Sequence, residues 1–298
     1  MKVLIPVDIA HPHPDLIDHL QWLLPINGDN ITLLYVKEIL PSYERLIETT
    51  ADFPEDWTHQ IDKKVNEMFA PMKASLEKNG ASVSCEIVSG PPEHMIAAIA
   101  RDEHADLTVV SPGQRSVVEK FFLGSTSAGV FKLAPGTVLL LRDTPAHNQL
   151  RHVVFGVDGT ETALHAMKTA VEQFRLAERK IKATVLYAVS IPAMVQMLSP
   201  AEIVVAVEKN MEMEGETIIA EALKVLKDLG ISDAQPRLVV GEPAAEIIRF
   251  SQQSDVQLIV IGAQGHSLVE HLLMGSVAQR IITHAGCSTA IVKPPRKK

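Results

Sequence analysis

A run of glycines near the carboxyl end has the spacing expected of a phosphate-binding loop. Residues 262–276 read GAQGHSLVEHLLMGS, so Gly262, Gly265, Gly275 and Ser276 form a Gly-x2-Gly-x9-Gly-Ser frame directly after the apolar run LIVI. Glycine lets the backbone take positive φ values and approach an anion closely, because it has no Cβ. Ser276 falls where a helical periodicity starts, and the first N–H groups of a helix favour anions. The frame predicts phosphate binding; the alternative is a glycine turn with an ordinary serine cap.

Composition limits the classes of protein that this chain can belong to. It has 298 residues, of which 46% are hydrophobic and 21% charged, which suits a soluble globular protein of two domains. The formal net charge of −8 argues against nucleic-acid binding. Asp8 interrupts the first apolar run before a signal peptide could form, and no run approaches the 18 apolar residues of a membrane span. We therefore expect a cytoplasmic protein that binds neither membrane nor nucleic acid.

The two cysteines, Cys85 and Cys287, stand far apart with no Cys-x-x-Cys spacing. This pattern argues against a disulfide framework and a structural zinc site. We expect both thiols to fill small spaces in the core.

The chain contains an internal duplication. Gly124-Ser125 and Gly275-Ser276 lie about 150 residues apart, and Gly90 and Gly241 are separated by the same offset. Asp8 and Asp158, each at the end of an apolar run, are separated by nearly the same distance. The polar, proline-containing stretch 142–151 joins the two copies. We predict domains at residues 1–145 and 150–298, with the boundary near Asn148.

Each copy alternates short β-branched runs with helical patterns. Near-continuous apolar strands separated by helices are typical of a parallel sheet covered on both faces. The predicted strands are residues 3–7, 31–36, 83–88, 107–110 and 138–141, and then 153–157, 183–189, 237–240, 258–261 and 289–292. Between the second and third strands, apolar residues recur at helical spacing over residues 57–76, where Pro71 should kink or divide the helix. The fold class is α/β, with two tandem, doubly wound, five-stranded domains whose ligand site lies outside the carboxyl ends of the strands.

The glycine frame follows the fourth strand of the second copy, and neither copy has Gly-x-Gly-x-x-Gly after its first strand or a Gly-Lys-Ser/Thr motif. Together with an Asp at the end of the first strand, this arrangement resembles the universal stress protein family over essentially the whole chain, twice. The resemblance implies a tandem member that binds ATP in its second repeat. It also implies that the two halves form a pseudo-twofold pair, for which residues 138–141 and 289–292 are the candidate edges.

The resemblance assigns a set of nucleotide-binding residues to the second repeat. They are Gly156, Val157, Asp158, Ala188, Ile261, Gly262, Gly265, His266, Gly275, Ser276, Val277 and Ala278. Asp158 would lie near the adenosine and a nucleotide-bound Mg²⁺, the backbone of Ala188 would contact adenine, and Gly275 to Ala278 would present N–H groups to the phosphates. Two alternatives stay open: Asp158 as a helix cap and His266 as a solvated loop residue.

The first repeat departs from this pattern. Ser111 and Gln114 stand where Gly262 and Gly265 stand in the second, and two Cβ atoms should weaken phosphate binding. We predict a weaker or vestigial site that comprises Asp8, Val36, Gly113, Gly124 and Ser125.

The segment HPHPD, residues 11–15, brings His11, His13 and Asp15 to the mouth of the first site. A metal site there is conceivable, but proline after each histidine forces an extended chain, so solvated loop histidines are the preferred interpretation.

The leading hypothesis is a nucleotide-responsive binding protein of stress physiology with ATP, or ADP or AMP, as its ligand, Mg²⁺ as an accompanying ion and little or no turnover. The alternatives are a slow Mg²⁺-dependent ATPase or phosphotransferase and a nucleotide-free interaction scaffold. The protein partner is unknown, and whole chains could form homodimers. The long segment 192–215, whose flexible methionines Met194, Met197, Met211 and Met213 suit either a partner surface or a core gap, is a candidate lid or interaction element.

Overall fold

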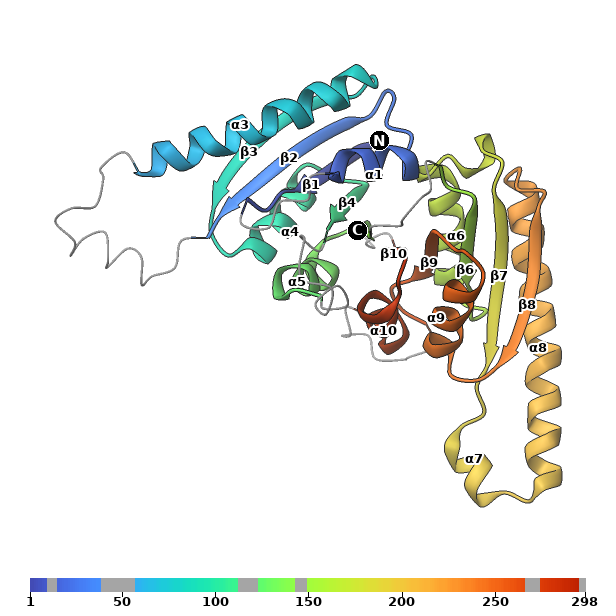
Figure 1. The fold of residues 1–298 in the computed structure, drawn as a ribbon. Coiled ribbons are helices and arrows are strands. Elements are labelled where there is room, and N and C mark those ends of the chain that lie inside the picture. The colour runs from blue at the N-terminus through green and yellow to red at the C-terminus, as the bar shows by residue number, and fades with distance from the viewer. Residues whose placement is uncertain (10–14, 39–56, 112–122, 143–148, 266–273, 295–298) are drawn as a thin grey trace. The chain divides into compact units, whose positions relative to one another are not determined.

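The computed structural model describes residues 1–9, 15–38, 57–111, 123–142, 149–265 and 274–294. The chain forms two compact units, Met1–Gln21 with Pro25–Val138, and Trp22–Leu24 with Leu139–Lys298 (Figure 1). The division between these units falls within a strand, whereas the boundary predicted near Asn148 lies outside the described residues.

The first half is built on the strand order β3-β2-β1-β4-β5. Its strands are β1 (Lys2–Pro6), β2 (Asn30–Lys37), β3 (Ser82–Ser89), β4 (Leu107–Val110) and β5 (Thr137–Leu140). Its helices are α1 (Leu16–Leu23), α3 (Trp57–Lys78), α4 (Pro92–Asp102) and α5 (Ser125–Leu133). β1 pairs in parallel with both β2 and β4, so the strand order reverses its direction at β1 and β4.

The second half repeats the order as β8-β7-β6-β9-β10. Its strands are β6 (His152–Gly156), β7 (Lys182–Val189), β8 (Ala234–Val240), β9 (Leu258–Gly262) and β10 (Ser288–Val292). Its helices are α6 (Glu161–Gln173), the short 3-10 helix η1 (Leu176–Glu178), α7 (Ala193–Leu198), α8 (Ala201–Asp228), α9 (Pro243–Gln253) and α10 (Ser276–His284). The predicted α/β class and its two parallel five-stranded units are confirmed.

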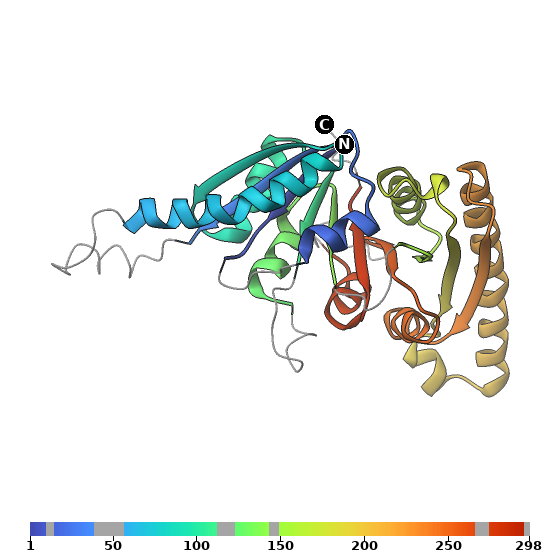
Figure 2. The same cartoon turned by 45° about the horizontal axis from the view of Figure 1, so that its top comes forward.

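Helices cover both faces of the second sheet. α6 contacts α8 and α9 contacts α10, and the two pairs lie on opposite faces (Figures 1 and 2). The chain moves in one direction along the sheet from β6 through β7 to β8, and in the opposite direction from β8 through β9 to β10. Because connections between parallel strands are right-handed, the helices of these two halves of the path lie on opposite faces.

The central strands form the core, and one strand in each half forms an exposed edge. All residues of β4 and β10 are buried, as are the first four of β6 and of β9. By contrast, β3 and β8 are largely exposed or half-buried, and β8 contains Pro236, which an edge strand tolerates because its N–H is not needed in the ladder. Continuous apolar runs thus correspond to strands with neighbours on both sides.

The structure bears on three expectations from the sequence. α3 is one helix through Pro71, so the proline does not divide it: Pro71 is exposed, and the carbonyl that loses its N–H partner can bind water, while Phe69 and Leu76 stay buried. Cys85 is exposed because its strand, β3, is an edge, whereas Cys287 is buried as predicted.

The third expectation concerns residues 192–215, the candidate lid or interaction element, which are mostly helical. Pro192 precedes α7 and Pro200 precedes α8, and each proline occupies the N-cap position. Ser199 between the helices is extended (φ −97°, ψ 150°), because a residue before proline is driven out of the helical region.

The difference between the two cysteines predicts their reactivity. Burial raises the pKa of the Cys287 thiol to about 12, so this residue is protonated as well as inaccessible at pH 8. We expect one fast-reacting thiol per native chain with a disulfide reagent such as DTNB, and two after unfolding. Cys85→Ser should remove the fast phase and Cys287→Ser should leave it unchanged; two fast thiols in the native chain would contradict this burial.

Candidate functional site

The second half contains a cavity at the point where the strand order reverses. β6 and β9 are neighbours whose following loops lead to opposite faces of the sheet, which is where doubly wound folds bind ligands. The cavity has a volume of about 300 Å³. It is lined by Gly156, Val157, Asp158, Ala163, Leu186, Tyr187, Ala188, Ser190, Met211, Pro243, Ile247, Ile261, Gly262, Ala263, Gln264, Gly265, Gly275, Ser276, Val277 and Ala278.

The residues predicted for the nucleotide site come together in this lining. All of them from Gly156 to Ala278 line the cavity except His266, which lies outside the described residues. The structure adds residues that were not among those predicted: Ala163, Leu186, Tyr187, Ser190, Met211, Pro243, Ile247, Ala263 and Gln264. Two of these had a detectable signal, because Pro243 follows the repeated Gly241 and Tyr187 has a counterpart, Tyr35, in the first repeat. Met211 and Ile247 carry no such signal, since only the packing of α8 and α9 brings them to the cavity.

Three helices begin at the cavity, and two of them carry their own caps. The Thr160 hydroxyl accepts a hydrogen bond from the Ala163 N–H (3.2 Å) at the start of α6. The Glu242 carboxylate accepts from the N–H groups of Ala244 (3.2 Å) and Ala245 (2.7 Å) at the start of α9.

The third helix, α10, starts differently. Its N-cap is Gly275, and among the described residues no side chain caps its first turn. The N–H groups of this turn therefore need an acceptor from solvent or from a ligand, and the helix dipole favours a negative charge there. Ser276, at the first helical position, adds a hydroxyl that also lines the cavity. Of the three helix starts, α10 is the one suited to an external anion.

The glycines of the motif serve for space and not for backbone conformation. Gly262, Gly265 and Gly275 all have φ outside the left-handed region, which corrects the expectation that they supply positive φ. A Cβ on Gly265 would overlap the Asp158 carboxylate, and one on Gly156 would lie 2.7 Å from Ile261 Cγ2. Side chains at these two positions would therefore collide with groups that shape the cavity.

The glycine of β9 has a similar but milder constraint. A Cβ on Gly262 would lie 3.1 Å from Thr162 Cγ2 and 3.3 Å from the Gln264 carbonyl oxygen, which is tight but not forbidden. Gly275 has more room, with the Ala263 carbonyl oxygen at 3.5 Å as the nearest atom, while its own N–H donates to that oxygen at 2.8 Å. This hydrogen bond holds the start of α10 against the end of β9.

Asp158 is held by Thr160, which is itself the N-cap residue of α6. Its Oδ1 accepts hydrogen bonds from the Thr160 N–H (3.0 Å) and the Thr160 hydroxyl (2.6 Å). Its second oxygen faces Gly265. Among the described residues that line the cavity, Asp158 carries the one charged side chain, which contributes a negative charge to it.

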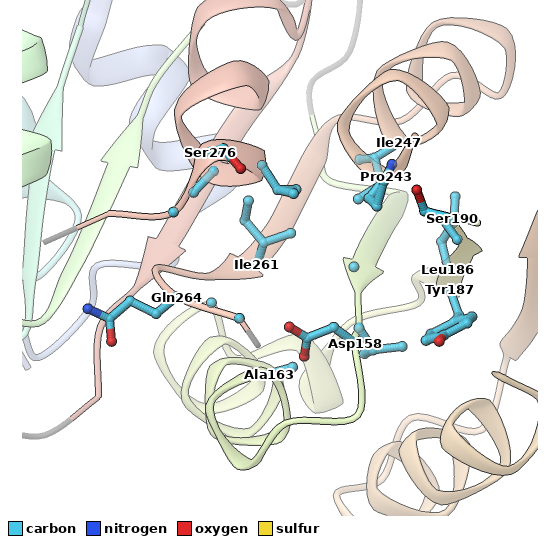
Figure 3. A pocket seen from close by; sticks show the side chains of 18 of the residues that line it. Asp158, Ala163, Leu186, Tyr187, Ser190, Pro243, Ile247, Ile261, Gln264 and Ser276 are labelled. Atoms are coloured by element: carbon cyan, nitrogen blue, oxygen red, sulfur yellow. The ribbon is translucent and has the colours of Figure 1, made fainter. Parts of the chain in front are cut away.

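The cavity has two chemically different ends. Figure 3 shows Ser276 and Gln264 at one end, Leu186, Tyr187 and Ser190 at the other, and Ile261 and Asp158 between them. The apolar side chains of Pro243 and Ile247 lie toward the Tyr187 end, and Met211 also lines the cavity. Burial raises the pKa of Tyr187, with smaller contributions from Glu214 and Asp158, so the phenol stays protonated at neutral pH. One end thus suits a flat apolar group, and the other an anion.

The first half retains part of the same arrangement. Asp8 follows β1, Val36 lies in β2, Gly124 is the N-cap of α5 and Ser125 begins that helix. Burial raises the pKa of Tyr35, and the charge of Asp8 adds to this as Asp158 does for Tyr187.

Other first-site candidates lie outside the described residues, namely Gly113, Gln114, His11 and His13, although Ser111 follows β4 as predicted. Within the described ranges, no group of three or more His, Cys, Asp or Glu side chains could hold a metal ion. The described helices also include none that is long and apolar enough to cross a membrane.

The fold and cavity define a tandem, doubly wound α/β protein with an anion-compatible site at a switch point of its second sheet. The model of the universal stress protein family matches residues 1–142 and again residues 149–293. The chain therefore belongs to the universal stress protein family and carries two copies of its domain.

Relatives and solved structures agree with this assignment. Universal stress protein Slr1230 of Synechocystis is 23% identical over 279 residues, which cover 88% of this chain and 88% of that protein. Universal stress protein MJ0531 of Methanocaldococcus jannaschii is 29% identical over 152 residues, or 51% of this chain and 86% of its own length. The crystal structure of a universal stress protein from Archaeoglobus fulgidus matches with a TM-score of 0.68 at 16% identity and covers 98% of this chain and 96% of its own. This last likeness shows the fold.

A substitution that adds one methyl group, Gly265→Ala, tests the close approach of Gly265 to Asp158. Gly265→Ala fits the backbone, so its cost comes from the collision of the new Cβ with the carboxylate. We expect the free energy of unfolding of the second domain to fall by about 1–3 kcal/mol, as in other overpacked sites. Urea denaturation measures this.

Gly286→Ala is the matched control, because a Cβ there meets nothing within 4 Å and the backbone is not left-handed. Its effect should stay within about 0.5 kcal/mol. Equal stability of the two variants would show that the loop at Gly265 is not packed on Asp158.

Proposed function

We propose that this protein binds ATP in its second domain and acts as a nucleotide-responsive binding protein with little or no turnover. The observation that carries the proposal is the start of α10, which opens on the cavity without a side-chain cap among the described residues while α6 and α9 are capped. An N-terminus of this kind is a ready site for phosphate.

The chemistry of the cavity suggests how the nucleotide is oriented. The adenine ring would pack at the apolar end near Leu186, Ala188 and Met211, with the backbone of Ala188 available for hydrogen bonds. The phosphates would extend past Ile261 to the N–H groups and hydroxyl of Ser276 and the N–H groups of Val277 and Ala278. Because a helix dipole contributes about 0.3–1 kcal/mol to an exposed anion, most of the affinity must come from the buried base and from several N–H bonds together.

A divalent cation fits this site for electrostatic reasons. The described lining contains no Lys, Arg or His side chain, and Asp158 adds a negative charge beside a polyphosphate. We propose that Mg²⁺ is carried in with the nucleotide and that Asp158 contacts it, because protein ligands for a free-standing metal site are lacking in the described chain.

The first domain is proposed to bind nucleotide weakly or not at all. Ser111 stands after β4 where the second domain has Gly262, and Gln114 stands where it has Gly265. Gly265 shows why this matters, since in the second domain a Cβ at this position would overlap the aspartate after the first strand.

Turnover is proposed to be incidental. Among the described lining residues, Asp158 is the one carboxylate that could serve as a base, and Thr160 holds its Oδ1 with two hydrogen bonds. The enzymatic alternative, a slow ATPase or phosphotransferase, requires Mg²⁺-dependent phosphate release that disappears in Asp158→Ala.

The remaining proposals follow the sequence. The domain limits are residues 1–145 and 150–298, the location is the cytoplasm, and ADP or AMP are secondary ligands. Pairing of the two halves and homodimerisation of whole chains also stay predictions. If no nucleotide binds, the alternative function is a nucleotide-free interaction scaffold.

Isothermal titration tests nucleotide binding directly. We expect one ATP per chain with a dissociation constant in the micromolar range, equivalent to about −8 kcal/mol. Gly275→Glu should abolish binding, because the new carboxylate competes with phosphate for the N–H groups of α10.

The matched control for this titration is Gly124→Glu, which places the same charge at the N-cap of the equivalent helix, α5, and should leave the affinity unchanged. No binding by the unmodified protein would remove the proposal. Two equal sites, one lost in each variant, would contradict a vestigial first domain.

The variant Asp158→Asn tests whether Asp158 contacts the Mg²⁺ ion. It removes the negative charge but keeps an oxygen acceptor for both Thr160 hydrogen bonds. In EDTA, the unmodified protein should bind ATP about tenfold more weakly than with Mg²⁺, a difference of about 1.4 kcal/mol. Asp158→Asn should bind metal-free ATP more tightly than the unmodified protein, because the repulsion is gone, and should gain little from Mg²⁺. If both proteins respond equally to EDTA, Asp158 does not contact the cation.

A further inference from the structure

The second domain carries a helical arm, residues 193–214, made of α7 and the part of α8 that precedes Gly215. Every residue of α7 is exposed or half-buried, and the first buried residue of α8 is Gly215. Figure 1 shows α7 and this end of α8 extending beyond the carboxyl end of β7. A six-residue helix is not stable in water by itself, so α7 depends on packing against other groups.

The arm is unusually apolar for such an exposed element. Met197 and Leu198 are 81% and 77% exposed, and Met194 is 70% exposed. Three further side chains on α8 are at least half exposed, namely Ile203, Val205 and Met213. Scattered single apolar residues need no explanation, but six large ones on one short arm indicate a surface that another molecule covers.

The charges of the arm determine which kind of molecule fits. Four glutamates, Glu202, Glu208, Glu212 and Glu214, accompany one lysine, Lys209. A carboxylate-rich surface repels a second copy of itself and an anionic membrane, but attracts a chain that carries Lys and Arg. Methionine side chains are flexible and polarisable, so they adapt to irregular apolar faces, as in surfaces that accept amphipathic helices.

From these observations we propose that the arm is a docking site for a basic amphipathic helix of a partner protein. The partner's apolar stripe would cover Met194, Met197 and Leu198, and its basic side chains would face the glutamates of α8. The exposed part of α8 is about 21 Å long at 1.5 Å per residue, so a partner helix of about 14–18 residues matches it.

The arm is connected to the nucleotide cavity at both of its ends. Ser190, just before α7, and Met211, on α8, line the cavity. At the base of the arm, a Cβ on Gly215 would lie 2.6 Å from Tyr187 Cδ1, so α8 rests directly on a ring that also lines the cavity. A ligand that contacts Met211 and Tyr187 therefore alters the support of the arm, and cavity occupancy sets its affinity for the partner. This coupling, unlike the docking itself, rests on the proposed function.

The docking is tested with two fluorescent 18-residue synthetic helices that differ only in charge, one with Leu on one face and Lys on the other, and one with Glu in place of Lys. Fluorescence anisotropy with the full chain should show at least tenfold tighter binding of the Lys peptide. The double variant Met197→Gln, Leu198→Gln should weaken that binding at least tenfold at unchanged net charge. Its circular dichroism should match that of the unmodified protein, because both side chains are exposed.

Val240→Gln is the matched control, because Val240 is also an exposed apolar residue (47%) but lies at the end of β8, outside the arm. Its affinity for the Lys peptide should change less than twofold. Failure of the Lys peptide to bind, equal binding of both peptides, or equal weakening by the control overturns the docking site. Dimers in sedimentation that the double variant abolishes would overturn it in favour of a second copy.

The coupling has a separate readout. Saturating MgATP should change the affinity for the Lys peptide at least threefold in the unmodified protein and leave it unchanged in Gly275→Glu. If titration shows that ATP binds but peptide affinity does not move, the coupling is wrong. If ATP does not bind while the peptide still does, the proposed function fails and the docking site stands.

Discussion

Helix α10 follows a glycine N-cap and has no side-chain cap within the described chain, so the residues of its first turn, from Ser276 to Ala278, line the cavity without a side-chain acceptor for their N–H groups. The rest of the site is organised around this feature. The N–H of Gly275 donates to the Ala263 carbonyl oxygen just after β9, which fixes where the helix begins relative to the sheet. Helices α6 and α9 start at the same cavity, but Thr160 and Glu242 satisfy their first N–H groups. Of the three helix starts at this cavity, α10 is therefore the one that lacks a side-chain cap among the described residues.

The absence of side chains at two glycines lets parts of the cavity wall approach each other closely. Gly265 approaches the Asp158 carboxylate and Gly156 approaches Ile261, so the loop after β9 and the end of β6 lie closer together than side chains would permit. Asp158 is held by two hydrogen bonds from Thr160 in the same short segment that caps α6. The negative charge, the cap and the glycine loop are therefore parts of one packed unit, and a change in any of them reaches the others.

In the same domain, a largely buried sheet lies next to the exposed arm of residues 193–214. Tyr187 is a buried residue near the end of β7, and its ring contacts α8 at Gly215, where the buried part of that helix begins. Elements with few buried contacts open most easily, and binding sites that respond to ligands are drawn from them. An adaptable surface next to a preorganised cavity is the arrangement expected of a protein whose ligand changes its choice of partner.

The sequence by itself determined the strands, because continuous apolar runs in a parallel sheet are buried on both faces. It also indicated the glycine frame, in which a Cβ on Gly265 would overlap the Asp158 carboxylate. The resemblance to the family, and not the local pattern, pointed to Ala188, which lines the cavity. Tertiary structure decided what local pattern does not encode. Only the strand order shows that β3 is an edge, which leaves Cys85 exposed, and only helix packing brings Met211 and Ile247 to the site. The exposure of Met197 and Leu198 was equally invisible, since the same apolar residues fill a core when another element lies over them and form a surface when none does.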